Sequence, residues 1–179
     1  MKYWFSIIGV ALVVFLASYQ ITLRRIPTMK MTMTEKRIAG VAGGKNIMYH
    51  ARRPDAAYRG VVRPSPDQLY SACIFDLGKG PVVFEGTAPE NSYWSLSFFQ
   101  HNTDNFFVVN DREIGGRAFR YVLVRKHQPP PKGFTPDEII ISPSKTGIVL
   151  QRVFINKEDR SAILDSQRRQ STCKMVALS

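Results

Sequence analysis

Hydrophobic and polar positions follow two different patterns along this chain, and the first is a long apolar run. Residues 3–23 are almost continuously apolar, with only a few uncharged polar residues among them. At about 1.5 Å per residue, a helix of this length spans a hydrocarbon core about 30 Å thick. Tyr3 and Trp4 lie where an interfacial aromatic belt is expected, and Arg24 and Arg25 follow the other end. The pattern predicts a transmembrane anchor.

A cleaved signal peptide is the alternative to an anchor. Lys2 fits an n-region, but the apolar run is long for an h-region, and no A-x-A site occurs around Ala17. The side of the membrane stays open. More Lys and Arg follow the run than precede it, which favours a cytoplasmic domain, whereas Lys2 ahead of the run is typical of export.

The second pattern consists of short apolar runs separated by turns rich in Gly, Pro, Asn and Asp. Strands are expected at 59–63, 69–75, 82–85, 93–100, 106–110, 119–126, 139–142 and 148–155. The run 69–75 is mostly apolar on both faces, which is typical of a strand inside a packed β domain. The sequence therefore predicts a mainly β protein, an antiparallel β-sandwich or jelly-roll-like domain, with an N-terminal transmembrane helix and a short C-terminal helix.

The remaining segments are polar. Residues 26–34 are Met-rich and indicate a tether, and 35–49 could form a short helix that its glycines weaken by about 1 kcal/mol each. The expected division is a transmembrane anchor (1–25), a tether with a short helix (26–45), a β domain (46–170) and a C-terminal tail (171–179).

The strand 93–100 carries different side chains on its two faces. Its even positions, Trp94, Leu96 and Phe98, are expected in the core. Its odd positions place two serines between aromatic residues, so they could line a cavity or face water. We favour water, because half-exposed antiparallel strands are common.

Charge and cysteine content change this description little. The net charge is +11, from 25 Lys and Arg against 14 Asp and Glu. The basic residues are spread along the chain without a nucleic-acid-binding motif, so we expect no nucleic-acid partner; plain solubility is the simplest explanation, and an anionic membrane surface the nearer partner. Two cysteines invite a disulfide in an oxidising compartment. However, Cys73 is expected to pack in a strand and Cys173 lies in the polar tail, so we expect them unpaired.

Motifs for catalysis, metal or cofactors are weak. His101 and Asp104 form a lone H-x-x-D pair, which predicts turn hydrogen bonds rather than a metal site. No nucleophile elbow, phosphate loop or dinucleotide fingerprint occurs. We therefore expect no metal and no cofactor.

The best candidate chemistry comes from polar residues at apolar positions. Arg152 lies on the apolar parity of its strand, and a buried arginine needs a carboxylate or a ligand anion. Asp67 or Asp76 could pair with it and fix the strand register, which is the simpler interpretation. Alternatively, Arg63 or Arg152 holds an anion while Asp67 or Tyr70 handles a proton.

Several spaced motifs carry a resemblance to a known family. They are R-P-S-P-D-Q-L-Y-S, F-D-L-G-K-G-P-V-V, Y-W-S-L-S-F-F, T-D-N-F and I-S-P-S-K-T-G-I-V-L-Q-R-V, followed by E-D before a helix. Over 46–167 the chain resembles the uncharacterised bacterial family called domain of unknown function, number 1254. The matching positions are Asp67, Leu69, Tyr70, Asp76, Pro81, Tyr93, Arg152 and Asp159.

The resemblance implies a mainly β fold, no established activity, and export. It also implies a companion domain, number 1214, which we expect to be a separate protein because it is not fused here. This companion-type protein is the expected protein partner. The lipid bilayer, which residues 3–23 would contact, is the other expected partner. Together these points predict a single-pass protein of the bacterial inner membrane with a periplasmic domain that binds a partner. An enzyme of hydrolase or lyase type, with Asp67, Tyr70 and Arg152 around a pocket, is the alternative; Arg63, Asp76 and Tyr93 are weaker binding candidates.

Overall fold

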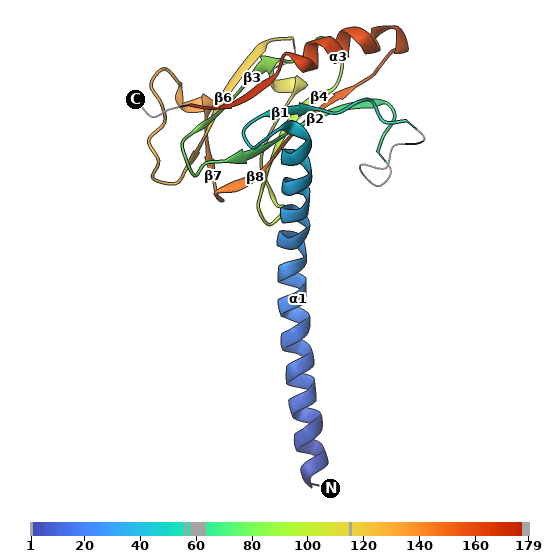
Figure 1. The fold of residues 1–179 in the computed structure, drawn as a ribbon, viewed down its shortest axis with the longest axis vertical. Coiled ribbons are helices and arrows are strands. Elements are labelled where there is room, and N and C mark those ends of the chain that lie inside the picture. Colours follow the sequence, from blue (N-terminus) through green and yellow to red (C-terminus); the bar gives the residue numbers. More distant parts are fainter. Residues whose placement is uncertain (1, 56, 58–63, 115, 177–179) are drawn as a thin grey trace.

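A long helix and a β domain make up the described chain. The computed structural model describes residues 2–55, 57, 64–114 and 116–176. Helix α1 spans Lys2–Ala42 and projects away from the β domain (Figure 1). Its apolar half is long and hydrophobic enough to cross a membrane, a test of length and composition that a signal sequence also passes.

Two glycines end α1. Gly43 has a φ of +82°, in the left-handed region that glycine adopts without strain. The N–H of Gly44 then donates to the carbonyl of Ala39 at 2.9 Å, which satisfies one of the last free carbonyls of the helix. The helix predicted over 35–49 therefore stops at Ala42.

The tether predicted over 26–34 is wrong, because α1 passes through it without a break. Pro27 lies inside the helix, although proline removes a helix hydrogen bond and disfavours helix by about 3 kcal/mol. Tertiary contact offsets this cost. Met31 is buried in a cluster with Ile74 and Ile148, so the end of α1 packs against the β domain instead of hanging loose from it.

Two sheets pack face to face and confirm the predicted mainly β, sandwich-like fold. Sheet A has the strand order β1 (Met48–His50), β2 (Gln68–Asp76), β8 (Thr146–Phe154), β4 (Trp94–Gln100), β5 (Asn105–Asn110). Sheet B has the order β7 (Ile139–Ser142), β6 (Ala118–Arg125), β3 (Val82–Thr87), β9 (Thr172–Met175). All described pairs are antiparallel except β6 with β7. The short helices are α2 (Asp111–Ile114), η1 (Pro136–Glu138), η2 (Glu158–Arg160) and α3 (Ser161–Arg169).

Strand β2 lies inside sheet A and is covered on both faces, as its pattern predicts. Leu69, Cys73 and Phe75 point into the space between the sheets, and Ala72 and Ile74 point outward beneath α1. Seven of the eight expected strands are present as β2 to β8. The eighth expected strand, 59–63, lies outside the described residues, as does the candidate residue Arg63.

One face of β4 packs in the core as predicted, and the other face differs from the prediction. Trp94, Leu96 and Phe98 are fully buried in the core between the sheets. The prediction that the other face meets water is wrong for Ser95 and Ser97, which are buried. Both hydroxyls are small, and longer side chains of β8 flank them in the same sheet.

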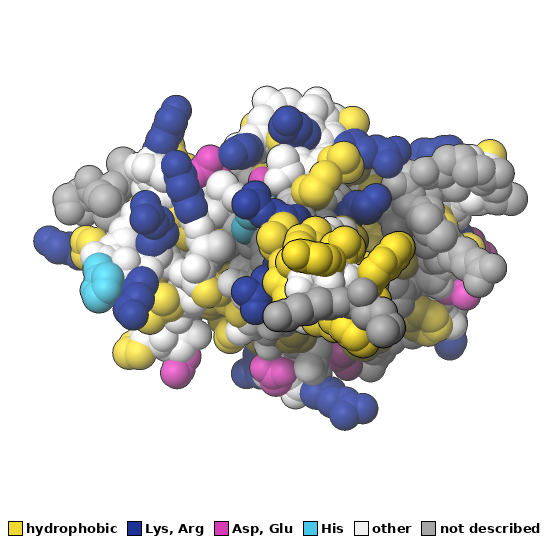
Figure 2. Space-filling model, turned by 90° about the horizontal axis from the view of Figure 1, so that it is seen from below, with side chains coloured by type: hydrophobic (Ala, Val, Ile, Leu, Met, Phe, Trp, Pro, Cys, Tyr) yellow, Lys and Arg dark blue, Asp and Glu magenta, His cyan; other side chains and the backbone are white. Residues whose placement is uncertain are grey.

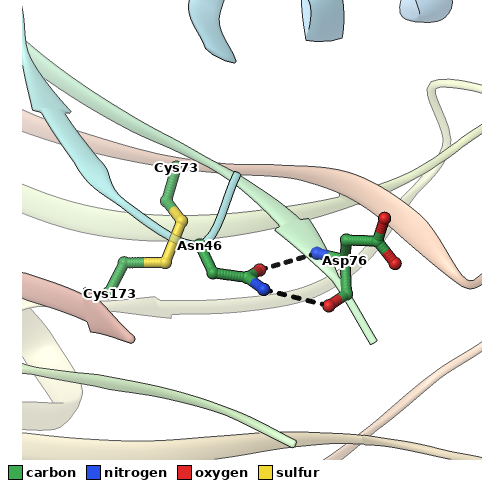
Figure 3. The surroundings of a disulfide bond; sticks show 4 residues. All are labelled: Asn46, Cys73, Asp76 and Cys173. Carbon is green, nitrogen blue, oxygen red and sulfur yellow. Dashed lines mark hydrogen bonds between the residues drawn. A yellow bond between two sulfur atoms is a disulfide. The ribbon is translucent and has the colours of Figure 1, made fainter. Parts of the chain in front are cut away.

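The last strand corrects two predictions. Residues 172–175 are not part of a tail but form β9, which pairs with β3. Cys173 on β9 is bonded to Cys73 on β2, so the expectation of unpaired cysteines is wrong (Figure 3). A polar segment can take part because β9 lies at the edge of sheet B and buries Cys173 while Lys174 and Met175 stay exposed. The disulfide joins sheet A to sheet B across the core.

Candidate functional site

The outer face of sheet A brings together two of the three predicted catalytic residues. Tyr70 on β2 and Arg152 on β8 are directly opposite in the strand pairing, and Ser95 on β4 is the next residue across. The Tyr70 hydroxyl donates to Gln68 Oε1 at 2.9 Å. Arg152 is half-buried and makes no hydrogen bond or ion pair with any residue that the structure describes. Arg152 therefore forms no ion pair with a described carboxylate, and neither Asp67 nor Asp76 is bonded to it.

The third predicted residue, Asp67, does not join this pair. It is exposed just before β2, and its carbonyl accepts a hydrogen bond from the N–H of Ile155 at 2.7 Å. Its charge is one of the smaller causes that raise the pKa of Arg53, after the hydrogen bond to Glu158. The structure thus places Tyr70 beside Arg152, whereas Asp67 lies in the exposed turn before β2.

Asp76 lies at the opposite end of β2, about 20 Å from Tyr70 at the usual rise of a strand. Its carboxylate binds Lys45 at 2.8 Å and accepts from the N–H of Gly78 at 2.9 Å. Burial raises the pKa of Asp76, but the hydrogen bonds from Lys45 and Gly78 outweigh burial and hold that pKa below its usual value. Asn46 fixes the backbone of Asp76 with two reciprocal hydrogen bonds, of 2.7 and 3.1 Å (Figure 3). Asp76 therefore orders a turn and is too far away to serve Arg152.

The buried arginine of this fold is Arg168 on α3, which the sequence analysis missed. Its side chain is 1% exposed. It donates to the carbonyls of Ala51, at 2.7 Å, and Tyr70, and to the hydroxyl of Ser71 at 2.9 Å. Asp165, one turn earlier on α3, neutralises it. Burial is the main cause that lowers the pKa of Arg168, against the opposing effect of Asp165. The spacing of Asp165 and Arg168, which puts both on one face of a helix, was the only signal for this cluster.

A serine and a histidine lie beside Arg168. The Ser71 hydroxyl is 2.9 Å from Nδ1 of His50. Burial, and next the charges of Arg168 and Arg169, lower the pKa of His50. The pair has the distance of a nucleophile and its base. However, Ser71 is 0% exposed and also accepts from Arg168, so no substrate reaches it; the cluster fastens α3 to β1 and β2.

His101 has a different role from the one its H-x-x-D spacing suggested. Its Nδ1 lies 2.9 Å from Oε1 of Glu35, which is buried on α1, and 3.2 Å from the hydroxyl of Thr146. Asp104 instead accepts from Gln100 and Asn102 within the turn. His101 therefore docks α1 onto the β domain. Within the described part of the chain, no group of three or more His, Cys, Asp or Glu could hold a metal ion.

Helix α1 covers only one end of the outer face of sheet A. Beyond it, three large apolar side chains stay exposed: Tyr93 (43%), Val108 (43%) and Phe154 (38%). The strand pairing puts Val108 opposite Ser97 and Phe154 opposite Gln68, on the same face as Arg152. We call this set, Tyr93, Val108, Arg152 and Phe154, the open face. It offers apolar area around the guanidinium of Arg152, which pairs with no described residue.

Solved structures with a similar fold are longer proteins. One is the VPA0106 protein from Vibrio parahaemolyticus, with a TM-score of 0.56, 15% identity, and coverage of 63% of this chain and 28% of that one. Another is an uncharacterised protein from Burkholderia cenocepacia, with a TM-score of 0.52, 13% identity, and coverage of 89% of this chain and 42% of that one. This chain thus spans less than half the length of either, and the likeness concerns the fold. No curated protein matches the chain.

The family comparison agrees with the fold and with the spaced motifs. The family described as "Protein of unknown function (DUF1254)" matches residues 45–175, which begin just after α1 and end with β9. The match takes in both sheets, the disulfide and the open face. This chain belongs to the DUF1254 family.

Proposed function

We propose that this protein is a single-pass, membrane-anchored binding or assembly module of the bacterial envelope. Helix α1 supports an anchor, because its apolar residues are exposed to the surroundings over the whole of 3–23 and only its last third packs on protein. Exposed apolar surface on this scale is stable in lipid and costly in water.

The observation that carries a binding role is the open face. Single exposed apolar residues are ordinary, but Val108 and Phe154 share one flat sheet face with the half-buried Arg152. Apolar and aromatic side chains together with arginine are typical of interface centres. A partner that fits would bring apolar side chains around a carboxylate placed to meet Arg152.

The partner we propose is a separate companion-type protein, number 1214. Both similar solved structures are more than twice as long as the part that this chain matches. We propose that a second protein of this type supplies the matching surface to the open face.

The disulfide supports a periplasmic position for the β domain. Disulfides persist in oxidising compartments and are rare in the cytosol. The bond between Cys73 and Cys173 therefore favours export, whereas the basic residues after the apolar run favour the cytoplasm. We give the covalent bond more weight, because the charge rule describes a bias among loops.

An enzyme of hydrolase or lyase type is the second candidate. The facing pair of Tyr70 and Arg152 supports it, since a guanidinium can hold an anion next to a phenol. The position of Asp67 weighs against it, because the proposed acid lies on the rim, away from that pair. A binding role does not require Asp67 to lie beside Tyr70 and Arg152.

The test is co-purification of the full chain with the co-expressed companion-type protein. Val108→Asp and Arg152→Glu should each reduce recovery of the partner at least tenfold. The matched control is Ile141→Asp, which also changes an exposed strand residue, but on sheet B. Equal recovery with all three variants would refute the open face as the docking surface. Loss with Ile141→Asp alone would move the interface to sheet B.

A further inference from the structure

Three turns of the β domain meet at the end of sheet A that lies next to α1. The β4–β5 turn contacts α1 through His101, as described above. The N–H of His101 donates to Oγ of Ser144 in the β7–β8 turn at 3.1 Å. The carbonyl of Lys145 in that turn accepts from the N–H of Leu77 in the β2–β3 turn at 3.0 Å. We call residues 77–80, 101–104 and 143–145 the turn surface.

Lysines gather at the turn surface. Lys79 and Lys145 are exposed, and neither forms an ion pair with another described residue. Lys145 lies over Gly78, where a Cβ would stand 3.0 Å from its Nζ. Lys79 and Lys45 line an open cleft of about 420 Å³ together with Asp76. The cleft lining carries two lysines and one carboxylate; with Lys145 beside it and Asp104 in the neighbouring turn, three lysines face two carboxylates, a net charge of +1.

Helix α1 sets the distance between the turn surface and the lipid. From Leu23, the end of the apolar run, to Thr32 the helix rises about 14 Å. Thr32 Oγ1 lies 3.5 Å from Nε2 of His101 in the β4–β5 turn. The headgroup layer takes up about 5–8 Å of that rise. The β4–β5 turn thus lies within about 10 Å of the headgroups, close to the Debye length of about 8–10 Å in physiological salt, and the other two turns are hydrogen-bonded in series to it.

The view along α1 from its N-terminal end agrees with this estimate. Figure 2 shows the face of the β domain that is turned toward the start of α1. Lys and Arg side chains surround the helix on that face, and fewer acidic side chains are visible there. A membrane that holds α1 would therefore meet a mainly positive surface.

We infer that the turn surface binds the headgroups of anionic phospholipids in the bilayer that α1 spans. This inference rests on the proposed anchoring by α1. Lys79 and Lys145 supply ammonium groups that form no ion pair with a described carboxylate, whereas Asp76 neutralises Lys45. Lipid phosphates satisfy them without a shaped pocket, because a basic surface near a bilayer is attracted by the potential of anionic lipid. Binding there holds the β domain in one orientation, with the open face directed sideways.

The experiment is hydrogen–deuterium exchange of the full chain in nanodiscs. One set contains phosphatidylcholine alone, and the other adds phosphatidylglycerol at about a third of the lipid. We expect backbone amides of 77–80 and 143–145 to exchange several-fold more slowly with anionic lipid. High salt should abolish the difference, because the attraction is screened. Lys79→Gln with Lys145→Gln should abolish it at low salt.

The matched control is Arg112→Gln with Lys157→Gln, which removes the same charge at the other ends of β5 and β8. This control should keep the wild-type difference. Equal exchange in both nanodiscs, or equal loss in both double variants, would overturn the inference. Slowing by inorganic phosphate in phosphatidylcholine nanodiscs would also overturn it, as it would show a phosphate site. Free exchange of residues 3–23 would instead contradict the proposed anchoring.

Discussion

Removal of the disulfide tests the most consequential structural difference from the sequence expectation. Cys73 and Cys173 are 100 residues apart, so the bond closes a long loop in the unfolded chain. In the chain-entropy description, a loop of that length contributes about 4–5 kcal/mol to the free energy of unfolding. A domain of this size is typically stable by about 5–15 kcal/mol, so the loss is a large fraction of the total.

The assay is urea unfolding of the full chain in detergent micelles, followed by the fluorescence of Trp94, which is fully buried. The two tryptophans are Trp4 and Trp94, so Trp4→Phe leaves a single reporter. We expect a reducing agent to lower the free energy of unfolding by about 4 kcal/mol. Cys73→Ala with Cys173→Ala should lower it slightly more, since both sulfur atoms also pack in the core.

Reduction breaks the bond but keeps both cysteine side chains, so it separates most of the effect of the cross-link from that of core packing. A fall of less than about 1 kcal/mol on reduction would refute the loop argument. Two free thiols in protein unfolded directly from its native membrane would refute both the bond and the proposed periplasmic position. The matched control is the doubly substituted variant, whose stability should not respond to the reducing agent.

Two further predictions concern the polar cluster beneath α3. Arg168→Met should lower the free energy of unfolding by about 3–5 kcal/mol, because it leaves buried carbonyl acceptors without a donor. Arg169→Met removes an exposed ion pair and should lower the free energy of unfolding by at most about 1 kcal/mol. Equal losses for the two variants in urea unfolding would contradict the burial argument. The folded-state pKa of His50 lies below its unfolded value, so the folded state resists protonation, and stability should fall as the pH drops below about 6.5. In unfolding curves between pH 5 and 8, His50→Asn should flatten this decline, and a decline as steep as in the wild type would assign it to another group.

The strands were predictable where side-chain pattern alone decides structure. β2 and β8 bury apolar residues on both faces or in alternation, and that pattern is visible in the sequence. β9 carries Lys and Thr beside its cysteine, and β1 is three residues long. Such edge strands form because the neighbouring strand offers backbone N–H and C=O groups for hydrogen bonds. Their own side-chain pattern is only a weak signal for a strand.

Long-range contacts also decided the features of the candidate site that were missed. The helix at 26–34 depends on Met31 finding the outer face of sheet A, which no local pattern announces. Arg152 was expected to be buried because of its parity, yet the buried arginine is Arg168 on the polar-looking α3. Parity predicts which way a side chain points, but burial depends on what covers that face. For Arg152, α1 stops short of covering it.

The unbroken course of α1 has a mechanical consequence. The helix is continuous from its exposed apolar residues to its contact with sheet A, so its two ends move together as one rigid element. Transmembrane helices lean by about 20° on average, and more in thinner bilayers. Over residues 24–42, a lean of that size shifts the sandwich sideways by about 10 Å. With α1 in the proposed membrane-spanning position, a change in bilayer thickness therefore changes the position of the whole β domain.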